Sequence, residues 1–267
     1  MEQLKQNLLR EKIKNYQKAL VAFSGGIDST LLLKIASEEI PTGVLAVTAV
    51  SDTFTEEELQ RTRELTKEFG VEHLIIQSNE MADARFVDNS PERCYYCKHL
   101  RFRTLKEIAR SRGIENVLDG SNVDDLADYR PGQRAIKELG VKSPLQEVGL
   151  TKAEIRELAR KKGIATWQAP AIACLASRIH YGETITKEKL YTIKEGEAFL
   201  RDLGFFPCRL RLHGNLARIE VPSDRLLDLM TLSEQVTTYL KKLGLTYVTL
   251  DMMGLRSGSM NEAIKGE

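Results

Sequence analysis

Two cysteines three positions apart give the first sign of chemistry in this sequence. Cys94 and Cys97 lie in the stretch RCYYCK, and the 267 residues contain only four cysteines. This spacing occurs in structural zinc sites, in redox-active pairs and in the ligand sets of iron–sulfur clusters. The helical pattern from about residue 95 to 112 predicts that the two thiols lie one turn apart at the start of a helix.

The other two cysteines lie in different surroundings. Cys174 follows a proline-containing bend in QAPAIACLASR, whereas Cys208 belongs to the predicted strand FPCRLRLH. Alternation along that strand places Cys208 on the same face as the leucines and opposite the arginines. We therefore interpret Cys208 as a buried apolar residue and Cys174 as the third candidate ligand.

Three thiolates suggest an iron–sulfur cluster, with zinc as the alternative. Structural zinc takes four ligands, and Cys94, Cys97 and Cys174 are one short of that number. A [4Fe–4S] cluster held by three cysteines would leave one iron open to carry an additional sulfide. Zinc bound by the same three cysteines with His99 or Cys208 is the competing interpretation. A redox pair is less favoured, because no thioredoxin-like βαβ pattern surrounds CYYC.

A glycine-rich loop offers a second kind of chemistry. The apolar run ALVAF leads directly into SGGIDST and then into a predicted helix. Gly25 and Gly26 allow backbone N–H groups to point at a phosphate, while Ser24 and Ser29 add hydroxyl donors. A Walker A loop would need a lysine before its serine, and this loop has none. The SGGxDS pattern resembles the PP-loop of the ATP pyrophosphatases, which release pyrophosphate and make an adenylate.

The stretch LDGSNVDD follows the fourth predicted strand and resembles the second signature of the PP-loop family. Sites in open α/β sheets form at the carboxyl ends of the strands, so this stretch belongs to the expected nucleotide site. Gly120 permits close approach, and Asn122 and Asp124 offer polar contacts. We expect Asp28 and Asp124 to contact Mg²⁺, with helix capping as the alternative role of Asp124.

The order of elements predicts the fold that positions these residues. Strands and helices alternate over the first part of the chain, which predicts an α/β fold with a parallel, doubly wound sheet of the PP-loop ATP pyrophosphatase type. After about residue 178 the pattern changes to that of a smaller α+β unit. We therefore expect residues 1–178 to form the ATP pyrophosphatase domain and residues 179–267 a domain for substrate binding or oligomerisation.

The composition restricts the partners of the protein. The formal net charge is +1, which disfavours binding to nucleic acid or to an acidic membrane. No apolar stretch is long enough for a membrane span, and the N-terminal pattern predicts an amphipathic helix and no signal peptide. We expect a cytoplasmic protein, because thiols stay reduced in that compartment.

Five segments together carry a resemblance to the LarE family. They are SGGIDST, LDGSNVDDLADYRPGQRAIKELGVKSPL, LTKAEIRELARKKG, PAIACLASRIHYGE and CRLRLHGNLARIEV. The resemblance runs over nearly the whole chain. It implies an ATP-dependent sulfur transferase that adenylates pyridinium-3,5-biscarboxylic acid mononucleotide and converts its carboxylates to thiocarboxylates. The product is a precursor of the nickel-pincer nucleotide cofactor of lactate racemase.

The resemblance also implies a sulfur source and an assembly. In one variant of the family a single cysteine, matched here by Cys174, gives up its sulfur and becomes dehydroalanine. In the other variant three cysteines hold a [4Fe–4S] cluster that carries the extra sulfide, and Cys94 and Cys97 favour this variant. ATP, Mg²⁺ and the cluster are thus the expected cofactors, and a sulfide donor is an expected partner. A homo-oligomer is also expected, since a similar family member forms a hexamer.

Two arginines form the expected anion site. Arg209 and Arg211 share one face of the predicted strand, and two guanidinium groups suit a phosphate. The family resemblance points to the same pair and adds two candidate polar partners, Glu197 and Asp228. The alternative is a solvated strand face on which the arginines pair with carboxylates such as Glu220.

The catalytic candidates are therefore Asp28, Cys174 and Glu197, and other functions stay open. Another PP-loop enzyme would be a tRNA thiolase with a basic nucleic-acid-binding patch, or an amidating ligase with an ammonia source. A nucleotide-sensing or metal-storage module would bind the same groups without releasing pyrophosphate. The C-terminal part contains as many basic as acidic residues, which argues against the thiolase.

Overall fold

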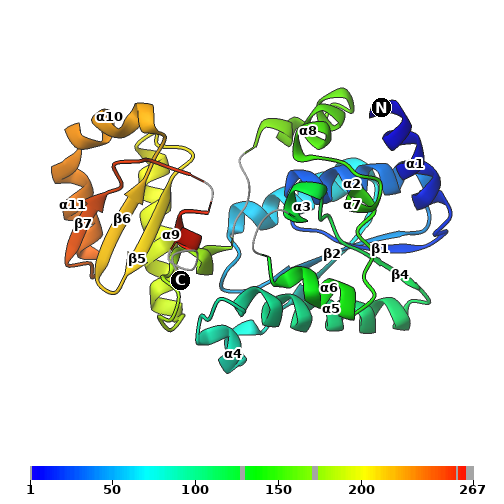
Figure 1. Ribbon diagram of the computed structural model, residues 1–267, viewed down its shortest axis with the longest axis horizontal. Coiled ribbons are helices and arrows are strands. Elements are labelled where there is room, and N and C mark those ends of the chain that lie inside the picture. Colours follow the sequence, from blue (N-terminus) through cyan, green and yellow to red (C-terminus); the bar gives the residue numbers. More distant parts are fainter. Residues whose placement is uncertain (1, 127–129, 170–173, 257, 263–267) are drawn as a thin grey trace. The chain divides into compact units, whose positions relative to one another are not determined.

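The computed structural model describes residues 2–126, 130–169, 174–256 and 258–262, and the chain divides into two compact units (Figure 1). The first unit comprises Met1–Glu80 and Cys94–Ile172, and the second comprises Met81–Arg93 and Ala173–Glu267. The second unit is therefore discontinuous in sequence, since a segment that precedes the cysteine stretch packs with the C-terminal third of the chain. No helix in these described ranges is long and apolar enough to cross a membrane.

The sheet of the first unit is parallel throughout. Its strands follow the order β3-β2-β1-β4, and Ala19 of β1 lies opposite Val44 on one side and Asn116 on the other. Most residues of β1 and β2 are buried, as expected for strands covered on both faces. The predicted α/β fold class is confirmed. The strands are β1 (Ala19–Ala22), β2 (Val44–Val50), β3 (Glu72–Gln77) and β4 (Asn116–Leu118).

Helices cover both faces of this sheet (Figure 1). Because side chains alternate along β1, Val21 joins the core on one face and Leu20 the core on the other. The first core is completed by α1 (Glu2–Lys14), α2 (Ile27–Glu39), α3 (Glu56–Phe69), α7 (Pro144–Glu147) and α8 (Lys152–Lys161). The second core is completed by α5 (Arg93–Ser111) and α6 (Gly132–Glu138).

The second unit contains a small mixed sheet in the order β5-β6-β7. β5 and β6 are antiparallel, and β7 runs parallel to β6. Gly196 of α9 lets this helix pack closely on the sheet, since a Cβ there would lie 2.4 Å from Leu210 Cδ2. The expected α+β pattern is confirmed. The elements are α4 (Ala84–Val87), α9 (Lys187–Asp202), β5 (Arg209–His213), β6 (Leu216–Glu220), α10 (Leu226–Thr231), α11 (Ser233–Lys242) and β7 (Tyr247–Leu250).

Asn89 ties the inserted segment 81–93 to the rest of the second unit. Its side chain is fully buried, and its backbone has φ 55°, a conformation that asparagine tolerates better than most residues. The Asn89 amide donates to the carbonyl oxygens of His180 at 2.8 Å and Glu183 at 3.0 Å. The Asn89 carbonyl accepts the N–H of Gly182 at 3.0 Å. A single side chain thus joins two stretches that are far apart in sequence.

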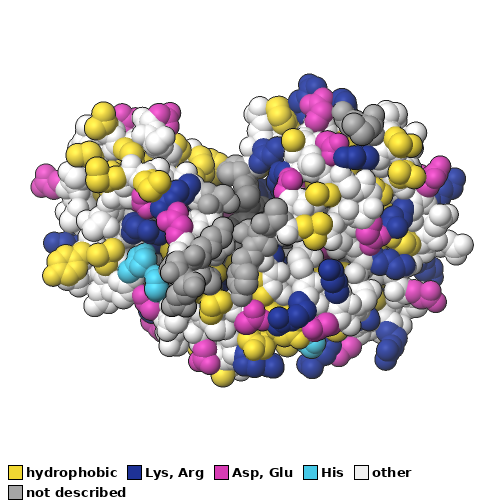
Figure 2. All heavy atoms as spheres, in the orientation of Figure 1, with side chains coloured by type: hydrophobic (Ala, Val, Ile, Leu, Met, Phe, Trp, Pro, Cys, Tyr) yellow, Lys and Arg dark blue, Asp and Glu magenta, His cyan; other side chains and the backbone are white. Residues whose placement is uncertain are grey.

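Basic and acidic side chains are interspersed over the surface that Figure 2 shows. The described side chains of that face form no continuous basic stripe of the kind that tracks a nucleic-acid backbone. This distribution agrees with the formal net charge of +1.

Candidate active site

The glycine loop joins β1 to α2 in a conformation that requires glycine. Gly25 has φ +72°, and a Cβ there would lie 3.1 Å from Thr62 Cγ2. The Ser29 hydroxyl donates to the Gly26 carbonyl at 3.0 Å, and the Ser24 N–H donates to the Ser29 hydroxyl at 3.4 Å. These contacts tie the loop to the first turn of α2, where backbone N–H groups favour an anion.

The second PP-loop signature meets this loop at Gly120, directly after β4. A Cβ on Gly120 would lie 2.9 Å from the Ser29 nitrogen and 3.3 Å from the Asp28 carbonyl carbon. Only glycine lets two backbones approach so closely. The close approach predicted at Gly120 is therefore present, and it brings the residues after β4 against the start of α2.

A polar group forms where the two signatures meet. Asp28 accepts a hydrogen bond from Asn122 Nδ2 at 3.3 Å and pairs with Lys152 Nζ at 2.5 Å. The Asn122 side-chain oxygen accepts the N–H of Asp124 at 2.9 Å. Asp124 Oδ2 accepts the backbone N–H of Lys152 at 2.7 Å. Asp124 thus contacts the start of α8, which is the capping role considered as its alternative, and both aspartates share Lys152 as a neighbour.

Lys152 is a site residue that the sequence analysis does not predict. It directly follows the N-cap Thr151, which forms a capping box with Glu154. Lys5 of α1 pairs with Glu154 at 2.7 Å and holds the same turn from the other side. The capping box predicts where the helix begins, but no local pattern indicates which carboxylate a lysine side chain will reach.

Helix α5 presents the first two cysteines in its first turn, as predicted. Cys94 is exposed, Cys97 is half-buried, and none of the four described cysteines forms a disulfide. Gly132, in the RPG segment, starts α6 close to this turn, since a Cβ there would lie 3.2 Å from the Cys94 carbonyl oxygen and 2.7 Å from Lys98 Cδ. The first turn of α5 is thus supported by a neighbouring helix.

Two ion pairs hold α5 against the carboxyl ends of the strands. Lys98 pairs with Asp119, which follows β4, at 3.4 Å. Arg101 pairs with Glu80, which follows β3 and is fully buried. Burial opposes a charge on Glu80, but Arg101 and the Ser51 hydroxyl outweigh it and hold the pKa of this carboxyl below its ordinary value. The position of the cysteines therefore depends on charges one and two turns further along the helix.

Cys174 lies in the second unit, directly before the 3₁₀ turn Leu175–Arg178, and is exposed. Arg178 is buried and donates to both carboxylate oxygens of Glu197, at 2.9 and 3.2 Å. The same guanidinium donates to the Cys174 carbonyl at 3.1 Å. Glu197 also accepts the N–H of Leu210 at 3.1 Å. Glu197 is thus linked to Cys174 through one arginine and to β5 directly.

The two predicted phosphate-binding arginines differ in their contacts. Arg211 is 7% exposed, pairs with the buried Glu220 at 2.9 Å and donates to the Ser177 carbonyl at 3.2 Å. Arg211 thus has the carboxylate partner that the alternative interpretation names. Arg209 is half-buried, and burial, followed by the charge of Arg178, lowers the pKa of its guanidinium. Arg211 is therefore removed from water, and Arg209 is partly removed from it.

The structure also describes three further residues that the sequence analysis names. Cys208 is 2% exposed, and burial raises the pKa of its thiol to about 12, which confirms its interpretation as a buried apolar residue. Asp228 pairs with Arg225 at 2.7 Å, at the start of α10. His99 lies on α5 with its ring centroid 5.8 Å from that of Tyr95.

Within the described ranges, no set of three or more His, Cys, Asp or Glu side chains is arranged to hold a metal ion. Cys94 and Cys97 belong to the first unit, and Cys174 belongs to the second. Asp28 and Asp124 supply two carboxylates beside the glycine loop, which are donors of the type that Mg²⁺ prefers. The three-cysteine ligand set is therefore a prediction.

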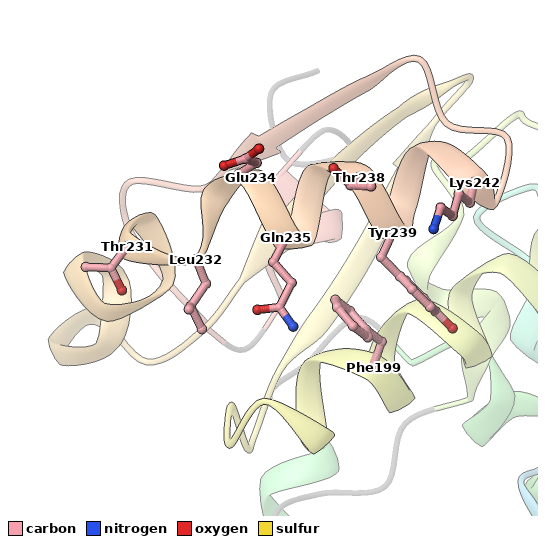
Figure 3. Close-up of a pocket in the computed structure, with 8 residues that line it drawn as sticks. All are labelled: Phe199, Thr231, Leu232, Glu234, Gln235, Thr238, Tyr239 and Lys242. Carbon is pink, nitrogen blue, oxygen red and sulfur yellow. The ribbon is translucent and has the colours of Figure 1, made fainter.

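Two surface grooves contain none of the predicted site residues. One lies between α9 and α11 (Figure 3), where the rings of Phe199 and Tyr239 stack at 3.9 Å beside polar side chains such as Gln235. The other lies in the first unit, along the second half of α5, and is lined in part by Arg103 and Arg110. Neither groove bears on the chemistry of the two PP-loop signatures.

Comparison with known proteins identifies the family. Residues 1–129 match the family model of the PP-loop domain. The chain is 39% identical to the pyridinium-3,5-bisthiocarboxylic acid mononucleotide synthase of Lactiplantibacillus plantarum over 253 residues, which cover 94% of this chain and 92% of that protein. The chain belongs to the LarE family.

Two other relatives of this LarE-family chain are similar to all or part of it. It is 41% identical to an uncharacterized protein of Synechocystis over 96% of both chains. It is 28% identical to the glutamine-hydrolysing GMP synthase of Aeropyrum pernix, over 69% of this chain and 39% of that protein. The LarE-family chain is thus an enzyme of the PP-loop ATP pyrophosphatase class, as the SGGIDST loop predicts.

Proposed function

We propose that this protein is an ATP-dependent sulfur transferase that converts carboxylates of pyridinium-3,5-biscarboxylic acid mononucleotide to thiocarboxylates, for a nickel-pincer nucleotide cofactor. The observation that carries the proposal is its similarity, over nearly the full length of both chains, to a protein named as the synthase of the bisthiocarboxylic acid mononucleotide. The junction of the two PP-loop signatures at Asp28 supports it, because the glycine loop and the polar residues after β4 meet at the carboxyl edge of the sheet, where open α/β sheets bind ligands.

The proposed reaction consists of two substitutions. A carboxylate oxygen of the substrate attacks the α-phosphorus of ATP, and the bond to pyrophosphate breaks. The resulting acyl adenylate can expel AMP, whereas a free carboxylate would have to expel oxide. A sulfur nucleophile then adds to the acyl carbon, and AMP leaves with one oxygen of the original carboxylate. One carbon–oxygen bond is thereby exchanged for a carbon–sulfur bond.

The first substitution is assigned to the first unit. Backbone N–H groups of Gly25 and Gly26 and the hydroxyls of Ser24 and Ser29 would bind the phosphates, because they line the turn from β1 into α2. Asp28, with Asp124 beyond Asn122, would hold Mg²⁺. When bound, this ion would neutralise charge on the departing pyrophosphate.

The sulfur is assigned to Cys94, Cys97 and Cys174. All three are at least partly accessible, in contrast to the buried Cys208. We propose that they hold a [4Fe–4S] cluster, which would supply a sulfide when loaded by a sulfide donor. These thiols supply three ligands of the type such clusters take.

The substrate phosphate is assigned to Arg209, with Arg211 beside it on β5. Arg211 is buried and Arg209 is half-buried, and removal from water strengthens a contact to an anion. Glu197 would act as a positioning residue. Its two contacts to Arg178 orient the guanidinium that holds the Cys174 carbonyl.

The test is a defined reaction with the mononucleotide, ATP, Mg²⁺ and sulfide, using protein purified without oxygen. We expect one pyrophosphate and one AMP for each oxygen replaced by sulfur, measured by mass spectrometry of the nucleotide product. Pyrophosphate release without any thiocarboxylate would refute the sulfur transfer. It would favour the alternative that the protein is another adenylating PP-loop enzyme. Iron and sulfide analysis of the same preparation tests the cluster separately.

A further inference from the structure

Lys152 forms an ion pair with Asp28, the carboxylate that the proposed function assigns to a metal. Its Nζ lies 2.5 Å from Asp28 Oδ2, while Asn122 Nδ2 contacts the other oxygen of Asp28 at 3.3 Å. Both oxygens of Asp28 therefore have partners, and the charged partner is the lysine. The side chains of Asp28 and Lys152 are 23% and 29% exposed, so solvent ions can approach the pair. A divalent cation that binds Asp28 must compete with this ammonium.

The backbone of Lys152 is held by contacts that do not involve its side chain. Asp124 accepts the Lys152 N–H at 2.7 Å, and the capping box of Thr151 and Glu154 closes the same turn. Lys5 adds an ion pair to Glu154 at 2.7 Å. A lysine ammonium on a four-carbon stem can therefore change partners by rotamer changes alone, while α8 stays in place.

We propose that Lys152 is the resident counter-ion of Asp28, that Mg²⁺ displaces it when the nucleotide binds, and that the released ammonium then contacts the phosphates. The inference rests on the proposed function, because it takes ATP and Mg²⁺ as the ligands. The exchange follows from charge. Asp28 without a metal needs a cation, whereas metal-bound Asp28 does not, and phosphates in the loop of residues 24–29 give the ammonium a partner with more negative charge.

The experiment measures binding of α,β-methylene-ATP by calorimetry at a series of Mg²⁺ concentrations. This analogue cannot be cleaved at the bond that the reaction breaks, so binding is read without turnover. In Lys152→Met the Mg²⁺ concentration for half-maximal binding should fall about threefold, because a partly exposed competing ion pair is removed. At saturating Mg²⁺ the dissociation constant of the analogue should rise about tenfold, through loss of a charge-assisted contact.

Two further variants separate this role from a structural one. Lys152→Arg keeps a cation beside Asp28. Its midpoint, the Mg²⁺ concentration for half-maximal binding of the analogue, should stay within about twofold of the wild-type value. Lys5→Met removes the ion pair to Glu154 but leaves the charge at Asp28 intact, so its midpoint should equal that of wild type. A fall in the midpoint that is confined to Lys152→Met would not arise from loosening α8.

The outcomes distinguish the inference from the proposed function. An unchanged or raised Mg²⁺ midpoint in Lys152→Met, with normal binding by wild type, would overturn the counter-ion role and leave ATP use intact. An unchanged analogue affinity at saturating Mg²⁺ would overturn the contact with the phosphates. Failure of the wild-type protein to bind the analogue at any Mg²⁺ concentration would overturn the proposed function, and the inference with it.

Discussion

At the scale of single residues, the described ion pairs differ in how readily they can be exchanged. The pair between Asp28 and Lys152 is partly exposed, whereas the pair between Arg178 and Glu197 is buried on both sides. Breaking a buried pair leaves an uncompensated charge in a poorly solvated place, which is far more costly than breaking an exposed one. We therefore expect substitutions at Asp28 to change chemistry, and substitutions at Arg178 or Glu197 to change stability as well.

Replacing Asp28 by asparagine should abolish pyrophosphate release that depends on the mononucleotide. The amide keeps the size of the side chain but removes the charge that we assign to Mg²⁺. Thermal unfolding should stay close to that of wild type, because the Asp28 pair is partly exposed. Chromatography of the nucleotide products checks the result. Formation of ADP and phosphate by the wild-type enzyme would contradict the interpretation of SGGIDST as an ATP pyrophosphatase loop.

Arg209 and Arg211 should respond differently to truncation. Arg209→Ala should raise KM for the mononucleotide about tenfold to a hundredfold, with a smaller change for ATP, because a charge-assisted phosphate contact is lost. Arg211→Ala should also lower stability, since it leaves the fully buried Glu220 without its closest cation. Steady-state kinetics with each substrate varied, together with urea unfolding, tests both statements. A wild-type KM for the mononucleotide in both variants would show that Arg209 and Arg211 have only a structural role.

The three accessible cysteines should differ from the buried one in iron content. Cys94→Ala, Cys97→Ala and Cys174→Ala should each lose iron and activity after anaerobic purification. Cys208→Ala should keep both and lose about 1 kcal/mol of stability through a small cavity. Equal iron loss in the Cys208 variant would contradict the three-ligand set. A wild-type protein mass lowered by one H₂S after turnover would instead indicate dehydroalanine at Cys174.

The sequence predicts the structural role of residues that belong to a local pattern, but it does not predict their distant contact partners. The sequence predicts a glycine turn at Gly25 and Gly26 and the close approach at Gly120, because both follow from backbone geometry at a strand end. It does not predict that Lys152 reaches Asp28, a residue 124 positions away. That contact depends on how α8 packs on α2, which no short motif encodes.

At the scale of elements, α5 is the helix whose placement matters most for the proposed chemistry, because it carries Cys94 and Cys97. Its start and end agree with the sequence prediction to within two residues. Its orientation depends on Lys98 and Arg101, which pair with carboxylates after β4 and β3. The helix was thus predictable from periodicity, but the anchoring charges were not, because Glu80 has no local pattern that marks it as buried.

Replacing Arg101 by methionine should destabilise the first unit by about 3 kcal/mol, because Glu80 is fully buried and would lose its cation. Arg103→Met is the matched control, since Arg103 is exposed on the same helix and should cost less than about 0.5 kcal/mol. Urea unfolding at neutral pH measures both. Equal stability of the two variants would show that Glu80 does not depend on Arg101.

At the scale of the whole molecule, the second unit is built from two stretches of chain. Arg93 donates to the Ala176 carbonyl at 3.0 Å, and the Ile185 N–H donates to the Val87 carbonyl at 2.9 Å. The change of pattern near residue 178 was readable from the sequence, but the membership of residues 81–93 was not. Short segments without periodicity carry no signal about the distant elements they pack against.

Replacing Asn89 by alanine should destabilise the protein by about 2–4 kcal/mol. The substitution leaves the carbonyls of His180 and Glu183 without their buried donor and places a Cβ residue without a side-chain hydrogen bond at φ 55°. Asn89→Gly relieves the backbone part and should recover about 1 kcal/mol of that loss. Chemical denaturation gives both values. A loss below about 1 kcal/mol in Asn89→Ala would mean that this side chain does not join the two stretches.

The divided second unit also has a consequence for synthesis on the ribosome. Asn89 is made about 90 residues before its partner Glu183, which at roughly 5–20 residues per second is a delay on the order of ten seconds. During that time Phe86, which is 1% exposed in the folded protein, belongs to a unit whose C-terminal part has not yet been made. Residues 81–93 therefore lie on the nascent chain, directly ahead of the cysteine helix, before the native partners of Asn89 have been made.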